Sequence, residues 1–190
     1  MASQGPNSPS SASNVANTAF AWSNVTNVFS SDNSYATNTC SGNTDYILAT
    51  GFGFSIPSGA TIDGIVVEVE DKCNIAGVSL LRVILYWGGT DRGLGKSSAS
   101  DMGTSDAYES MGSSVDTWNA FPAGTNINLS DFGVKIWVTV GGKSAATVSV
   151  DHVRITVYYT GGGGGGGSAV KQRASFSCLG TRVGVRQVMG

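Results

Sequence analysis

Few side chains in this 190-residue sequence could carry out catalysis. The single histidine, His152, follows Asp151 and is the natural candidate for a general base. A serine nucleophile needs such a base beside it, and an exposed turn such as G-x-S-x-G to present it, but the chain has no such segment. We therefore expect His152 to be structural, bonded to a backbone carbonyl or a neighbouring side chain. No catalytic residue and no enzymatic activity are predicted.

Carboxylates offer a second kind of chemistry. Glu68 and Glu70 lie on one face of a predicted strand, about 7 Å apart, a spacing that any strand provides. They alternate with valines, so a solvated strand face is the interpretation we favour over a glycosidase pair. Calcium would require clustered aspartates, and DNS (32–34), GTD (89–91) and SDA (105–107) are candidates without a D-x-D-x-D-G loop. We expect no metal and no cofactor.

The three cysteines, Cys40, Cys73 and Cys178, match no zinc-binding spacing. An odd number is also atypical of a secreted disulfide framework. We interpret them as small, semi-buried residues, and a Cys40–Cys73 bridge stays open.

Tryptophan could bind sugars by stacking. The chain has four, Trp22, Trp87, Trp118 and Trp137, and in a sandwich most tryptophans belong to the core. Strand alternation places Trp87 inward and Trp137 outward. An outward aromatic ring on a strand usually covers a loop or joins an interface. If a glycan binds, we expect Trp118 and Trp137 with the 88–126 loops to form its site.

The last candidate is a basic C-terminal segment. Seven basic and all 13 acidic residues precede Gly161, a net charge of −6, whereas the four remaining basic residues give residues 168–190 a net charge of +4. Seven glycines, 161–167, form a flexible linker between the two. We expect this segment to dock on a partner protein. The alternatives are a solvated, disordered tail and nucleic-acid binding, for which four spaced cations are few. The side chains expected to bind this partner are Lys171, Arg173, Phe176, Arg182, Val183, Val185 and Arg186.

These candidates must be positioned by strands, because no segment shows a helical period. Charged residues make up 13% of the chain, roughly half the usual share, and Ser, Thr, Asn and Gly replace them. Period-2 alternation is clearest in TIDGIVVEVEDKC, VSLLRVILYW and FGVKIWVTV. In the last predicted strand, ATVSVDHVRITVYYT (146–160), the apolar residues switch from even-numbered to odd-numbered positions, which predicts a β-bulge near Asp151–His152. The pattern predicts an all-β fold, an antiparallel β-sandwich of jelly-roll type with about eight strands.

The domain organisation follows from these segments. Residues 1–18 are rich in Ser, Asn, Pro and Ala and are expected to form an extended arm or a disordered leader. The sandwich is expected to cover 19–160, with short strands near Ala19–Trp22 and Tyr35–Cys40 and a loop-rich stretch at 88–126. The linker at 161–167 and the basic segment at 168–190 complete the chain.

Four stretches resemble a domain of uncharacterised phage and prophage proteins. They are AWSNVTNVFSSDNSYAT, ATGFGFSIPSGATIDGIVVEVE, GTSDAYESMGSSVDTW and VDHVRITVYYT, within residues 19–160. The resemblance implies a structural virion protein, such as a head decoration, head fibre or tail module, with no enzymatic activity. It does not cover residues 1–18 or anything after Thr160.

We therefore expect a phage structural protein, fixed to a capsid or tail protein by its C-terminal segment and forming a homo-oligomer, for which a trimer is the guess. The alternative is a carbohydrate-binding adhesin or receptor-binding tail module that recognises a host surface glycan, and a depolymerising enzyme is the third hypothesis. The first residues lack a positive n-region and an apolar h-region, so no signal peptide is expected. No membrane or nucleic-acid partner is predicted, and the expected location is the virion, assembled in the host cytoplasm and released by lysis.

Overall fold

The computed structural model describes residues 1–77, 79–141 and 145–161, which form two antiparallel β-sheets packed face to face. The strands of sheet A, in spatial order, are β1 (Ala2–Asn7), β10 (Ala146–Gly161), β5 (Ala60–Cys73) and β8 (Ala107–Ser113), and β3 (Ala36–Cys40) also pairs with β10. The strands of sheet B are β2 (Ser11–Val15), β4 (Tyr46–Thr50), β9 (Gly133–Val140), β6 (Ser79–Trp87) and β7 (Thr90–Ser97). Two short helices, η1 (Val25–Val28) and α1 (Gly124–Ile127), lie between strands.

The strand order is that of a jelly roll with one strand added to each sheet. Without β1 and β2, the sheets read β3-β10-β5-β8 and β4-β9-β6-β7, four strands each. The expected all-β sandwich is thus confirmed. Every strand pair is antiparallel, and the inner faces of both sheets meet in a single core of valine, isoleucine, leucine and aromatic side chains.

The segment expected to be an N-terminal arm is part of both sheets. β1 pairs with β10, with Ala2 opposite Tyr159, and β2 pairs with β4, with Ala12 opposite Ala49. Backbone hydrogen bonds make these pairings, and they require no hydrophobic pattern in the sequence. The short strand expected near Ala19–Trp22 is absent, because residues 19–22 form no strand. Trp22 is nevertheless buried.

The stretch expected to be loop-rich, 88–126, contains β7, β8 and the start of α1. β7 and β8 are the edge strands of sheets B and A, so each has one paired side only. The 98–106 segment joins them, with Met102 buried beneath it.

The predicted alternation is confirmed in the central strands. Ile65, Val67 and Val69 of β5 are fully buried, as are the inward residues of β6 and β9 apart from the slightly exposed Trp87 and Val140. The predicted β-bulge in β10 is also present, because the register with β5 shifts between Val150 and His152.

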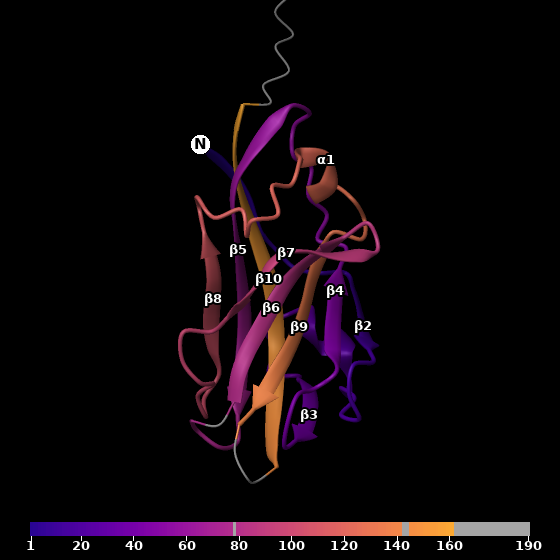
Figure 1. Ribbon diagram of the computed structural model, residues 1–190, viewed down its shortest axis with the longest axis vertical. Helices are drawn as coiled ribbons and strands as arrows, with labels where there is room; N and C mark the ends of the chain where they lie inside the picture. The colour runs from indigo at the N-terminus through magenta and orange to yellow at the C-terminus, as the bar shows by residue number, and fades with distance from the viewer. Residues whose placement is uncertain (78, 142–144, 162–190) are drawn as a thin grey trace, which may run out of the picture.

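Several elements meet at one end of the sandwich. Figure 1 shows α1, the start of β5 and the end of β10 at the same end of the elongated molecule, near the N-terminus. Gly161, the last described residue, lies opposite Ala60 in the β10–β5 register. Among the residues described, no helix has the length and apolar character needed to span a membrane.

Candidate functional site

His152 lies where β10 changes partner along one edge. β3 pairs with residues 146–150 of β10 and β1 pairs with residues 155–159, so the bulge falls in the gap between them. In that gap the Ser8 hydroxyl lies 2.8 Å from His152 Nε2. From the other side, beyond β5, Tyr108 of β8 places its hydroxyl 2.7 Å from Nδ1. Burial, and then the positive charge of Arg154, lower the pKa of His152 below its usual 6.5. Both ring nitrogens are engaged by neighbouring side chains, and this contact ties the N-terminal segment to β10.

The carboxylates of β5 are not the solvated row that the sequence predicts. Glu68 and Glu70 are both half-buried, and Glu68 accepts two hydrogen bonds of 2.9 Å from Arg154 in a bidentate pair. One oxygen of Glu70 is fully buried without a hydrogen-bond partner among the described residues. Glu68 and Arg154 can pair because they lie opposite each other on the adjacent strands β5 and β10.

A further carboxylate, Asp71, points into the core and is only 2% exposed. Burial, together with the nearby negative charges of Glu109 and Asp106, raises the pKa of Asp71 to about 8. This carboxyl group is therefore protonated at neutral pH. Within the described residues no three or more His, Cys, Asp and Glu side chains come together as a metal site would require.

The two described cysteines, Cys40 and Cys73, are buried free thiols. They lie on opposite sides of β10, opposite Ala146 and Val148 respectively, so the strand separates them. The Cys40–Cys73 bridge that the sequence left open is absent, and Cys178 lies outside the described residues.

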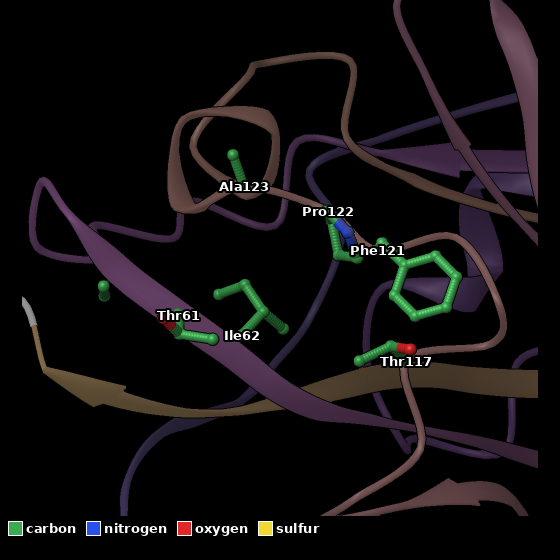
Figure 2. Close-up of a pocket in the computed structure, with 7 residues that line it drawn as sticks. Thr61, Ile62, Thr117, Phe121, Pro122 and Ala123 are labelled. Carbon is green, nitrogen blue, oxygen red and sulfur yellow. The ribbon is translucent and has the colours of Figure 1, made fainter.

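A shallow hollow of about 300 Å³ lies at the end of the sandwich near α1. Figure 2 shows Ile62, Phe121 and Pro122 around it, together with the threonines Thr61 and Thr117. Phe121 is 75% exposed and has a left-handed backbone with φ 45°. The lining offers apolar surface and two hydroxyl groups, with no charged side chain to orient a ligand.

The structure separates the two tryptophans that the sequence grouped as a glycan site. Trp118 is 1% exposed and donates a hydrogen bond of 2.9 Å from Nε1 to the Ile65 carbonyl. It is a core residue that closes the space between β5 and the loop after β8, so the prediction of a binding role for it is wrong. Its position in a loop gave no alternation from which its direction could be read.

Trp137 does point outward, on the outer face of sheet B, where it is half-buried. Tyr46 of β4 contacts it edge to face, with ring centroids 5.4 Å apart. Tyr86 of β6 lies on the same face, and Lys135 Nζ lies between the two tyrosines, 5.4 Å from the Tyr46 ring and 5.1 Å from the Tyr86 ring. We call Tyr46, Arg82, Tyr86, Lys135 and Trp137 the sheet B platform.

Strand register brings the sheet B platform together. In the β6–β9 pairing Arg82 lies opposite Trp137 and Ile84 lies opposite Lys135, while β4 places Leu48 opposite Lys135 from the other side. On β7, Gly95 has no side chain to cover the Trp137 ring, and a Cβ there would lie 3.6 Å from it.

The two positively charged side chains of the sheet B platform, Lys135 and Arg82, have different kinds of partner. Lys135 is 16% exposed and forms a 2.7 Å ion pair with Asp91 of β7, which neutralises it. Arg82 donates from Nε to the Thr139 hydroxyl at 3.2 Å. The Trp137 indole N–H and the hydroxyls of Tyr46 and Tyr86 have no hydrogen-bond partner among the described residues, and none of the three is sealed from solvent. These polar groups are free to bind a ligand.

Comparison with known proteins yields only distant structural likenesses. No protein-family profile matches the chain, and no curated protein matches its sequence. A solved carbohydrate-binding module, CBM4, aligns with 66% of this chain and 85% of its own at 14% identity and a TM-score of 0.39. TmCBM61, solved in complex with β-1,4-galactotriose, aligns with 79% of this chain and 93% of its own at 9% identity and a TM-score of 0.40.

The remaining predicted site residues, Lys171 to Arg186 of the basic segment, lie outside the described residues. Of the described candidates, Trp137 lies on an outer sheet face, as its strand alternation predicts, and its binding role stays a prediction. The sequence did not group Tyr46, Tyr86 and Lys135 with it. Alternation alone indicates that Tyr86 points away from the core. It cannot show which residues of β4 and β9 lie beside it, because that depends on register.

Proposed function

We propose that this chain is a non-catalytic carbohydrate-binding module whose ligand lies on the sheet B platform. The observation that carries the proposal is the gathering of Tyr46, Tyr86 and Trp137 on one outer sheet face, where their polar atoms have no partner within the part of the chain that the structure describes. An aromatic ring offers apolar surface to the C–H face of a sugar ring, and an indole N–H or a phenol hydroxyl bonds to sugar hydroxyls.

The location of the sheet B platform supports this use. Its side chains project from three neighbouring strands, β4, β9 and β6, so hydrogen-bonded backbone fixes their spacing. Contacts between Lys135 and the two tyrosines restrain the side chains themselves. A surface that is already in its binding arrangement loses little conformational entropy when a ligand binds.

Replacing Trp137 with alanine is expected to weaken binding to a recognised polysaccharide about tenfold or more, because the largest contact surface is lost. Affinity electrophoresis against a panel of plant, bacterial and host polysaccharides identifies the ligand, and isothermal titration measures the change. Tyr158→Ala is the matched control, since Tyr158 is a half-buried aromatic residue on the other sheet. A Trp137→Ala variant that is folded and binds as well as the unaltered chain would refute the sheet B platform.

A second candidate function is that of a virion structural protein attached to a particle by residues 168–190. The observation in its favour is the charge distribution: −6 on the body and +4 beyond seven glycines. Such a division suits a displayed domain with a separate anchoring segment. Display on a particle and glycan binding are compatible with each other.

Deletion of residues 168–190 is expected to leave a folded, soluble sandwich that no longer joins particles, because all β-strands of the described residues end by Gly161. Co-sedimentation with assembled particles measures incorporation, and thermal unfolding of the deletion variant confirms the fold. Incorporation at the level of the full chain would exclude the anchor.

A further inference from the structure

We infer that the sheet B platform selects glycans that carry a carboxylate group, such as uronic-acid polysaccharides, and that Arg82 recognises that group. The inference rests on the proposed function and names its substrate class. It comes from the way this one cation is placed among its neighbours.

Arg82 differs from the other cations of the described residues. Four of them form ion pairs: Lys72 with Asp106, Lys96 with Asp116, Lys135 with Asp91 and Arg154 with Glu68. A fifth, Arg92, donates to the Trp87 carbonyl and lies over the Trp87 ring. Within the described part of the chain, Arg82 alone has neither a carboxylate nor an aromatic ring as partner.

The guanidinium group of Arg82 is oriented without being neutralised. Its Nε donates to Thr139 Oγ1 at 3.2 Å, and both residues are half-buried on the outer face of sheet B. The Thr139 hydroxyl carries no charge, so the positive charge of Arg82 stays uncompensated. The two terminal NH₂ groups have no protein partner among the described residues, and a carboxylate can bind to this end with two parallel hydrogen bonds.

Arg82 is also next to the aromatic surface. It lies directly opposite Trp137 in the β6–β9 register, so the two side chains project side by side from neighbouring strands. A sugar ring stacked on Trp137 would therefore present a ring substituent to the guanidinium group. The carboxylate of a uronic acid is such a substituent.

Long-range attraction between the net charge of the protein and an acidic glycan would not produce this preference. The body carries a net charge of −6, which repels a polyanion at long range. Selection of an acidic glycan would therefore depend on local contact with Arg82. Salt screens long-range repulsion more than a short contact, so binding should not require low ionic strength.

The test compares each acidic polysaccharide of the panel with its carboxyl-reduced form, in which the carboxylate becomes a primary alcohol. The unaltered chain is expected to bind the acidic form about tenfold or more tightly, the worth of a charge-assisted hydrogen bond. Arg82→Gln should remove the preference by weakening binding of the acidic form only. Arg92→Gln, which makes the same charge change away from Trp137, should leave the preference intact.

The outcomes separate the two levels of the proposal. Equal binding of both forms, or binding of neutral glycans alone, would overturn the role of Arg82 and leave the carbohydrate-binding function standing. A preference that persists in Arg82→Gln would also overturn it. Failure of the whole panel to bind the folded chain would remove the proposed function itself, and the inference with it.

Discussion

Trp118→Ala is expected to lower the free energy of unfolding by about 3 to 5 kcal/mol, the usual cost of truncating a buried tryptophan. The side chain is almost completely buried and bonds to the Ile65 carbonyl, so the variant would leave a cavity and an unpaired carbonyl. Gly112, with φ 88°, lies closely against the indole ring and has no side chain that could fill the space left by it. Urea denaturation followed by circular dichroism measures the loss.

Trp118→Phe is the informative companion variant. It keeps most of the ring volume and removes the hydrogen bond to Ile65, so it should lose less stability than Trp118→Ala. Trp137→Ala, by contrast, removes a ring from the outer face and should change stability by less than about 1 kcal/mol. If Trp118→Ala were as stable as the unaltered chain and failed only in glycan binding, the assignment of Trp118 to the core would be wrong.

Asp71→Asn is expected to stabilise the chain above neutral pH. The folded-state pKa of Asp71 is about 8, well above its ordinary 3.8, so the unfolded chain gives up this proton at lower pH than the folded chain. Stability therefore falls as the pH rises from about 4 to about 8, by about 1.4 kcal/mol per pH unit. The asparagine variant escapes this loss, and after the cost of a buried amide without partners we expect a net gain of about 2 to 4 kcal/mol at pH 8.5.

The measurement is the difference in unfolding free energy between Asp71→Asn and the unaltered chain at pH 4.5 and pH 8.5. A small difference at the lower pH and a large one at the higher pH are expected. Asp101→Asn, which removes the charge of an exposed carboxylate in the 98–106 segment, is the control and should not reproduce the large gain at pH 8.5. A gain of equal size at both pH values would mean that the charge of Asp71 is not its cause.

The sequence predicted the strands that carry the core and missed those that do not. β5, β6 and β9 alternate because one face is buried in the apolar core and the other is mostly half-buried and carries more polar residues, which leaves a direct record in their sequences. β7, TDRGLGKS, has exposed residues on both faces, and β1 and β2 are equally polar. Edge strands such as these are held by backbone hydrogen bonds, which any residue except proline can make.

The residues of the candidate site also differ in how well the sequence predicts their positions. Trp137 lies in a regular strand, so its direction follows from Val138 and Ile136 on either side, which are buried. Trp118 lies in a loop where three residues, Trp118, Asn119 and Phe121, have left-handed backbones, and such geometry has no period to read. The proximity of Arg82 to Trp137 required the pairing of β6 with β9, which a single sequence does not specify.

The pairing of β1 with the end of β10 has a consequence for synthesis of the protein. Ala2 lies opposite Tyr159, so β1 leaves the ribosome more than 140 residues before the strand that pairs with it. β3 waits for the same strand, with Cys40 opposite Ala146. Until then the nascent chain exposes long apolar strands with free edges, and contacts between such distant residues form slowly. We expect chaperone dependence to end abruptly once β10 emerges, rather than to decline as successive strands appear.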